Sequence, residues 1–151
     1  MPSTVEGVSD EEAVRALARL SRLMERAVSD EGLSLAHFRV LAAVAEGEIR
    51  ASQVALRLAL GKPTVTASVD ALCRRGLLER HDIEDDQRVA ALHLTEEGQR
   101  VLADAERAMT ERLRGVLEHT KRPEESVRAL GRLGRGLDLV VAERLADKRP
   151  G

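Results

Sequence analysis

The stretch KPTVTASVDALCRRGLLERHDIEDDQRVAALHLTEEG, residues 62–98, changes its hydrophobic period twice and so decides the fold. Its first part, to about Arg75, has apolar residues at three- and four-residue steps, which predicts a helix. Pro63 suits the start of that helix because its missing N–H would have no partner there, and Gly76 is a typical helix stop. The segments LLERHDI and VAALHLT then alternate apolar and polar residues around the polar EDDQR, which predicts a two-stranded antiparallel hairpin. Another helix is predicted to begin at Thr95, an N-cap followed by two glutamates.

Two further helices are predicted immediately before this stretch. Ser34 suits the N-cap of a short helix. A third helix, within IRASQVALRLALG at residues 49–61, leads through a tight turn containing Gly61 into the helix that begins at Pro63. Two helices joined by such a turn and followed by a hairpin are the winged helix-turn-helix arrangement. The residues expected to face inward are Leu35, Phe38, Leu41, Ala42 and Ala45 in the first of these helices, and Val54, Ala55 and Leu58 in the second.

Longer amphipathic helices flank this unit, at Asp10 to about Ser29, at Thr95 to about Glu118, and from Pro123 towards the end of the chain. They carry more apolar surface than one small lobe covers, and pairing of two chains would bury it. Three glycines in the last helix fit either a close helix approach across such a dimer or a kink: Gly131, Gly134 and Gly136.

The expected fold class is therefore mainly α with a small antiparallel β-hairpin wing. We expect an N-terminal dimerisation helix in residues 1–32, a winged helix-turn-helix lobe in 33–98, and C-terminal dimerisation helices in 99–151.

Composition limits the classes of function. The chain has 151 residues, a formal net charge of −2 and 1% aromatic residues, so aromatic platforms for RNA or single-stranded DNA are excluded. A single cysteine, and four histidines without ligand spacing, predict neither a disulfide framework nor a metal site. No nucleophile–base pair or phosphate loop is present, so neither catalysis nor a cofactor is expected. With no long apolar stretch and an acidic N-terminus unlike a signal peptide, we expect no membrane association and a cytoplasmic location.

The helix at 63–75 carries unusual residues on its outward face. Relative to Val69, that face holds Thr64, Ala67, Ala71 and Arg74, with Ser68 and Asp70 on its flanks. Solvated helix faces normally favour Glu, Lys and Arg, whereas small side chains let a helix enter the major groove of DNA. Between Arg50 and Arg75 five basic residues face one acidic residue, a local charge of +4 in a nearly neutral chain. An ordinary surface helix remains the alternative, but the pattern favours binding to double-stranded DNA.

Three consecutive segments, LSLAHFRVL, KPTVTASVDALCRRGLLER and DDQRVAALHLTEEG, resemble signatures of the MarR family of bacterial winged-helix regulators. The resemblance covers about residues 33–100, and its most specific part is D-x-R followed six residues later by L-T. It implies a symmetric dimer that binds a palindromic operator. It also implies a repressor that a small ligand releases.

The same resemblance implies that Thr64, Thr66 and Ser68 face the major groove, and that Arg88 enters the minor groove with Asp86 positioning it. The chain departs from the family where Ala67 replaces a frequent arginine, which removes a guanine contact, and where Gln87 and Ile83 weaken the wing's phosphate binding. The angular analysis ranks Thr66 below Thr64. The predicted DNA-binding residues are Arg50, Ser52, Lys62, Thr64, Thr66, Ala67, Ser68, Arg74, Asp86 and Arg88.

Regulation leaves several alternatives open. An effector pocket is expected between the first, second and long helices, lined by Met24 and His37. Cys73 lies on the inward face of its helix, which favours a structural thiol, while the neighbouring Arg74 and Arg75 leave open a redox-sensing regulator. The acidic wing and Ala67 leave open an adaptor that binds protein and has lost DNA binding.

Overall fold

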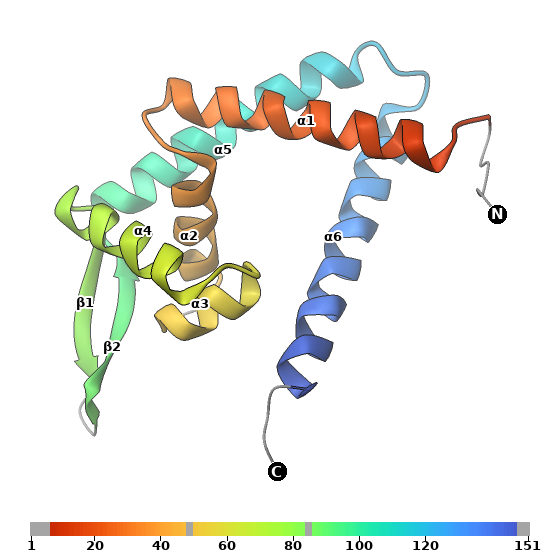
Figure 1. Cartoon of the computed structure of the whole chain (residues 1–151). Coiled ribbons are helices and arrows are strands. Elements are labelled where there is room, and N and C mark those ends of the chain that lie inside the picture. Colours follow the sequence, from red (N-terminus) through yellow and green to blue (C-terminus); the bar gives the residue numbers. More distant parts are fainter. Residues whose placement is uncertain (1–6, 48–49, 84–85, 148–151) are drawn as a thin grey trace.

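The computed structural model describes residues 7–47, 50–83 and 86–147, without the side chains at 82, 83, 86–89, 145 and 147. Six helices and two strands form within those ranges (Figure 1). α1 and α5 lie side by side, and the shorter helices and the hairpin form a lobe against them. α6 descends on the other side as an arm that contacts the lobe at α3. The elements are α1 (Asp10–Asp30), α2 (Leu35–Ala45), α3 (Ala51–Arg57), α4 (Lys62–Arg74), β1 (Leu78–Ile83), β2 (Asp86–Leu94), α5 (Glu96–Leu117) and α6 (Pro123–Asp147).

Side-chain hydroxyl groups cap the N-termini of three of these helices. The Ser9 Oγ accepts a hydrogen bond from the Glu12 N–H at 3.2 Å, and the Ser34 Oγ accepts one from the His37 N–H at 3.0 Å. Thr95 does more, because its Oγ1 accepts from the Gly98 N–H at 2.9 Å and donates to the Gly76 carbonyl at 2.6 Å. That second bond fixes the start of α5 to the turn after α4. The caps predicted at Ser34 and Thr95 are confirmed.

One continuous core fills the lobe. It takes residues from α2, α3, α4 and both strands, together with Val28 of α1 and Leu102 and Ala105 of α5. The prediction of inward Val54, Ala55 and Leu58 is confirmed, but Ala45 is exposed and Val44 is buried instead. The reason is that α2 contacts α1, α3, α4, α5 and β2, so its buried face is wider than a single stripe.

The α3–α4 turn places its unusual backbone at an alanine. Ala59 has a φ of 52°, in the left-handed region that favours glycine, whereas Gly61 has a φ of −64°. Gly61 is the N-cap of α4, which begins at Lys62 and puts Pro63 in its first turn. The tight turn is therefore as predicted, but Gly61 is not its left-handed residue.

The hairpin pairs Leu78 with Leu94 and Glu79 with His93, and the register is interrupted between Asp82 and Ile83. β2 begins at Asp86, earlier than expected. The segment expected to separate the strands is therefore partly strand, because Ile83 already pairs with Asp86 across the interruption. Positions 84 and 85 lie outside the described residues.

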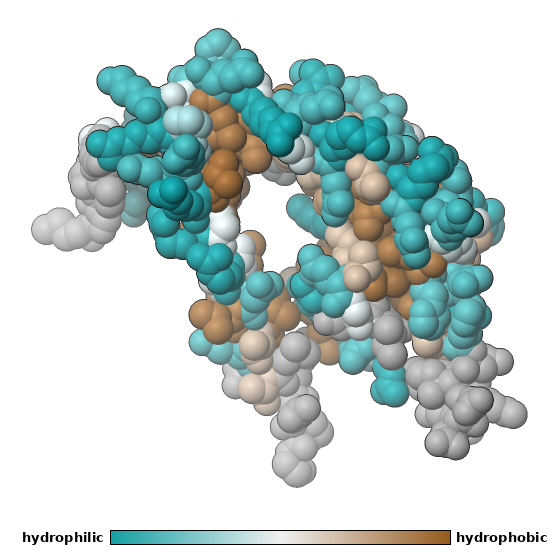
Figure 2. Space-filling view, turned by 180° about the vertical axis from the view of Figure 1, so that it is seen from behind, coloured by the Kyte–Doolittle hydropathy of each residue, from teal (hydrophilic) through white to brown (hydrophobic). Residues whose placement is uncertain are grey.

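Apolar side chains of α1 and α6 are left exposed within one chain. Val14 and Leu17 are exposed on α1, and the same holds along the α6 arm in the space-filling view (Figure 2). α5 combines both situations, since its first half enters the core and Val116 near its end is exposed. The exposed large apolar residues of α6 are Val127, Leu130, Leu133, Leu137, Leu139 and Val140.

Candidate nucleic-acid interface

The outward face of α4 consists of small residues. Thr64, Thr66 and Ala67 are exposed, as a helix that enters a groove requires. Ser68 is only 8% exposed, so the expectation that it faces outward is wrong. Ser68 lies three residues after Val65 and four before Leu72, the two residues on which the buried face is centred. For the same reason Thr66 lies on the exposed side, and the angular argument that ranked it below Thr64 is corrected.

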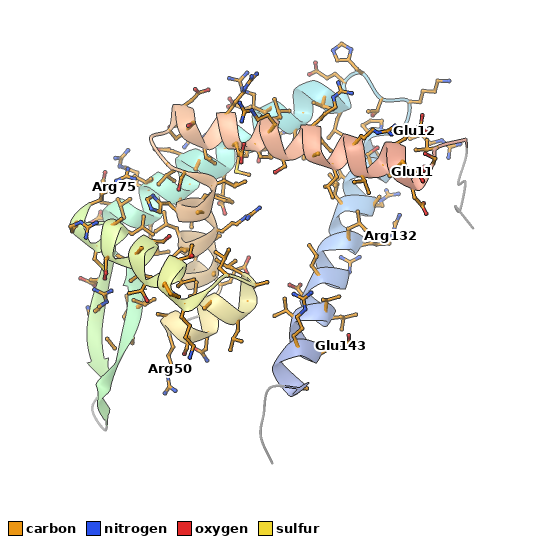
Figure 3. All side chains as sticks on the ribbon, viewed as in Figure 1. Glu11, Glu12, Arg50, Arg75, Arg132 and Glu143 are labelled. Atoms are coloured by element: carbon orange, nitrogen blue, oxygen red, sulfur yellow. The ribbon has the colours of Figure 1, made fainter. Side chains whose placement is uncertain are left out.

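Two ion pairs modify the local charge around α3 and α4. Arg57 pairs with Glu46 at the end of α2, and Asp70 pairs with Arg80 of β1. Within the described part of the chain, the other four basic residues of this region form no ion pair. Arg50 lies at the start of α3, and Arg75 lies at the end of α4 (Figure 3). These four residues are Arg50, Lys62, Arg74 and Arg75.

The Asp70–Arg80 pair connects the two elements that would contact DNA. The Arg80 Nη2 donates to the Asp70 Oδ1 at 2.5 Å, and both side chains are partly exposed. This hydrogen bond raises the pKa of Arg80 above its ordinary value. The pair therefore joins α4 to β1, the first strand of the wing.

Three further residues were predicted to contact DNA: Ser52, Asp86 and Arg88. Ser52 is exposed in the first turn of α3, two residues after Arg50, which is the N-cap of that helix. Asp86 and Arg88 both belong to β2, but their side chains lie outside the described residues.

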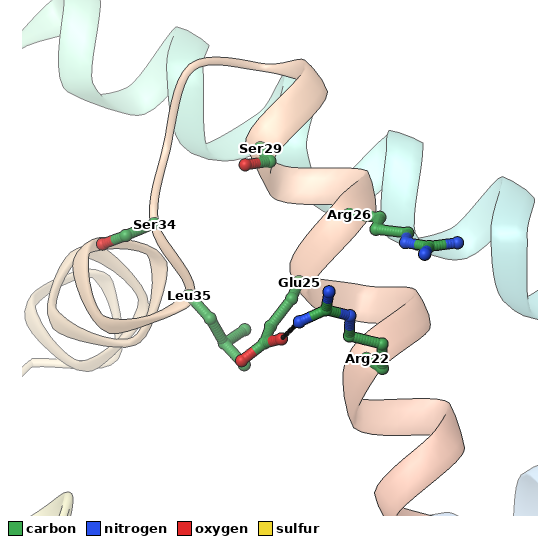
Figure 4. Close-up of a pocket in the computed structure, with 6 residues that line it drawn as sticks. All are labelled: Arg22, Glu25, Arg26, Ser29, Ser34 and Leu35. Atoms are coloured by element: carbon green, nitrogen blue, oxygen red, sulfur yellow. Dashed lines mark ion pairs between the residues drawn. The ribbon is translucent and has the colours of Figure 1, made fainter.

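A cavity of about 330 Å³ opens between α1 and the start of α2 (Figure 4). It lies near the predicted effector site, but Met24 and His37 are not among its lining residues. Its charged groups come from α1, where an Arg22 Nη1 lies 3.6 Å from a Glu25 Oε2. The lining residues are Arg22, Glu25, Arg26, Ser29, Ser34 and Leu35.

Four other titratable side chains lie in the lobe, at His37, Cys73, His81 and His93. Burial, and then the charge of Arg75, lowers the pKa of His37. Cys73 is a half-buried free thiol on α4.

His81 and His93 face each other across the hairpin, with ring centroids 4.8 Å apart. The sequence analysis missed this pair because the two residues are twelve positions apart; strand register was the signal that could have found it. Nowhere in the described ranges do three or more His, Cys, Asp or Glu side chains form a group that could hold a metal ion.

Comparison with known proteins agrees with this architecture. The model of the MarR family matches residues 31–89. The HTH-type transcriptional regulator YhbI of Bacillus subtilis is 37% identical over 59 residues, which span 39% of this chain and 38% of that protein's length.

Solved structures resemble a larger part of the chain. The transcriptional repressor CouR bound to a 23-mer DNA duplex is 26% identical, with a TM-score of 0.72, covering 83% of this chain and 90% of that one. CouR from Rhodococcus jostii RHA1 bound to p-coumaroyl-CoA is 22% identical, with a TM-score of 0.68, covering 85% and 87%.

The helix-turn-helix, the hairpin and the flanking helices define a winged-helix protein. Residues 31–89 resemble the MarR family, and over most of its length the chain has the fold of solved MarR family regulators. In the described ranges, every helix is too short or too polar to cross a lipid bilayer.

Proposed function

We propose that the chain is a transcriptional regulator that binds double-stranded DNA through α4 and the wing. The observation that carries this proposal is the exposed face of α4, where Thr64, Thr66 and Ala67 leave room for the helix in a major groove. Lys62 and Arg74 lie at the two ends of the same helix, where the DNA phosphates would pass. The DNA-bound relative with the same fold supports the assignment.

The proposed assembly is a homodimer on a palindromic operator. Isolated large apolar residues are common on protein surfaces, but α6 exposes six of them along one helix, and α1 adds Val14 and Leu17. A second copy would cover them through a two-fold axis. The two lobes would then read half-sites about 34–36 Å apart, one turn of DNA.

We propose that the regulator is a repressor released by a small acidic ligand in the α1–α2 cavity. Two guanidinium groups and two hydroxyls line the cavity, and such groups suit a carboxylate or phosphate. Arg26 forms no ion pair with any described residue, whereas Arg22 shares its charge with Glu25. The p-coumaroyl-CoA held by one structural relative is a ligand of this acidic class.

The test of DNA binding is a salt titration of affinity for DNA upstream of the chain's own gene. Affinity should fall steeply with salt, and Lys62→Ala should reduce the magnitude of the log–log slope by about one, the loss of one phosphate contact. Lys121→Ala, in the turn between α5 and α6, is the matched control and should keep the wild-type slope.

Arg88→Ala should weaken operator binding without changing the oligomeric state, because the change is confined to the wing. Wild-type affinity in Arg88→Ala would contradict the wing assignment. If no natural promoter fragment competes better than random DNA, the repressor proposal fails and the protein-binding adaptor becomes the better assignment.

The ligand proposal is tested by calorimetric titration of p-coumaroyl-CoA and coenzyme A into the protein. Arg26→Gln should lower the affinity at least tenfold, while Arg19→Gln, an exposed arginine on the same helix outside the cavity, should not. Equal affinity in both variants would place any binding elsewhere.

A further inference from the structure

The outer face of the wing brings two imidazole rings together. His81 on β1 and His93 on β2 have ring centroids 4.8 Å apart, and the ring planes are tilted by 41°. Both residues are exposed, so solvent reaches the pair. The rings are neighbours because Glu79 pairs with His93 across the strands, and Glu79 and His81, two residues apart on β1, lie on one face.

A carboxylate holds one of the two rings. The Glu79 Oε1 lies 3.0 Å from the His81 Nε2, with both side chains about half exposed. In metal sites, a histidine ligand characteristically donates its second ring N–H to a carboxylate, which fixes the ring and makes its free nitrogen more basic. Glu79 stands in that relation to His81, and its contact leaves the His81 Nδ1 available.

The separation of the rings fits one shared ion. Two imidazoles whose nitrogens lie about 2.0–2.1 Å from a common metal have ring centres roughly 5 Å apart. Arg80, which lies between Glu79 and His81 in the sequence, is paired with Asp70 of α4, so its charge is not directed at the ion.

We propose that His81 and His93 bind a divalent late transition-metal ion, Cu²⁺, Ni²⁺ or Zn²⁺, with Glu79 as the residue that positions His81. Imidazole nitrogens favour these ions, and affinity should be greatest for Cu²⁺. The described residues provide two imidazole ligands and no third side chain placed to ligate, so water fills the remaining positions. The ion would join β1 to β2 and add positive charge to the wing.

The test uses the full-length, untagged protein and calorimetric titrations with CuCl₂, NiCl₂ and ZnCl₂. One ion should bind per chain. His81→Gln and His93→Gln should each lower the affinity at least tenfold, and Glu79→Gln about tenfold with unchanged stoichiometry. His119→Gln, an exposed histidine in the turn after α5, is the matched control and should bind as the wild type does.

A spectroscopic readout separates ligation from a general loss of stability. The paramagnetic resonance spectrum of the Cu²⁺ complex should show coupling to two imidazole nitrogens, and each histidine variant should lose one. Thermal unfolding without metal should be the same in all variants, because these side chains are exposed. The proposal is overturned if His119→Gln weakens binding as much as His93→Gln does, or if the histidine variants bind Cu²⁺ as tightly as the wild type. Neither measurement involves DNA, so its result is independent of the proposed regulatory function.

Discussion

The winged-helix lobe and the α6 arm use similar apolar residues with opposite results. Val65, Val69 and Leu72 on α4 are at most 1% exposed, whereas Leu133 and Leu137 on α6 are 63% and 66% exposed. Both helices are amphipathic, but α4 is covered by α2, α3 and β1 of its own chain. Amphipathicity alone therefore does not reveal whether a helix packs within its own chain or requires a second one.

The largest expected effect follows from removing a side chain of the lobe core. Leu72→Ala should lower the free energy of unfolding by about 2–5 kcal/mol, because Leu72 is fully buried and its loss leaves a cavity. Urea unfolding measures this effect. Leu137→Ala is the matched control: it should leave the lobe intact and weaken stability only through the dimer, so that its effect depends on protein concentration. A concentration-independent loss of the same size would show that Leu137 stabilises its own chain and not a dimer.

The next largest effect on stability should come from replacing a glycine, Gly98 beside the lobe and Gly134 in α6. A Cβ at Gly98 would lie 2.0 Å from the Leu77 carbonyl oxygen, so Gly98→Ala should destabilise the lobe by about 1–3 kcal/mol through overpacking. A Cβ at Gly134 meets no atom within 4 Å in one chain. Gly134→Ala should therefore stabilise α6 by up to about 1 kcal/mol, from helix propensity, as measured by thermal unfolding. Weakened dimerisation in this variant would instead indicate close helix approach between two copies.

Ion pairs between elements should contribute less to stability than the core side chains do. A double-mutant cycle on Asp70 and Arg80 should give a coupling of about 0.2–1 kcal/mol that declines with salt, as expected for a partly exposed pair. The pair between Asp30 of α1 and Arg112 of α5 is longer, at 3.3 Å, and more exposed, so its coupling should be smaller. A cycle that gives no coupling between Asp70 and Arg80 would show that this contact does not hold the wing to α4.

The smallest effect is a pH dependence in the lobe. Burial, and then Arg75, lowers the pKa of His37 below its ordinary value of 6.5, so the unfolded chain takes up this proton first. Stability should fall as the pH drops below 6.5 towards the lowered pKa, and no such loss should occur above that range. His37→Gln should flatten the profile, while His119→Gln should keep the wild-type slope in urea unfolding measured from pH 7 to pH 5. Identical slopes in wild type and His37→Gln would contradict the assignment.

The sequence predicted the element order and most helix ends because those depend on local chemistry. Ser34 and Thr95 are caps whose hydroxyls bond N–H groups three residues away, so neighbouring residues suffice to identify them. The change of hydrophobic period after Gly76 likewise marked the hairpin. The boundaries predicted between the lobe and the dimerisation helices, at 32/33 and 98/99, stay predictions.

The site was less predictable, because rotation and register depend on distant partners. Ser68 was expected to face outward and is buried, since packing centres the buried face of α4 on Val65 and Leu72. The exposure of Thr66, the ion pair between Asp70 and Arg80, and the lining of the α1–α2 cavity also follow from how helices pack.

By itself, the sequence determined a winged helix-turn-helix between long amphipathic helices, because periodicity and capping are properties of neighbouring residues. Only the tertiary structure decided which small residues of α4 remain exposed, which basic residues remain unpaired, and that His81 and His93 meet across the hairpin. The physical reason is that these contacts join residues far apart in the chain, and their geometry is set by the packing of whole elements.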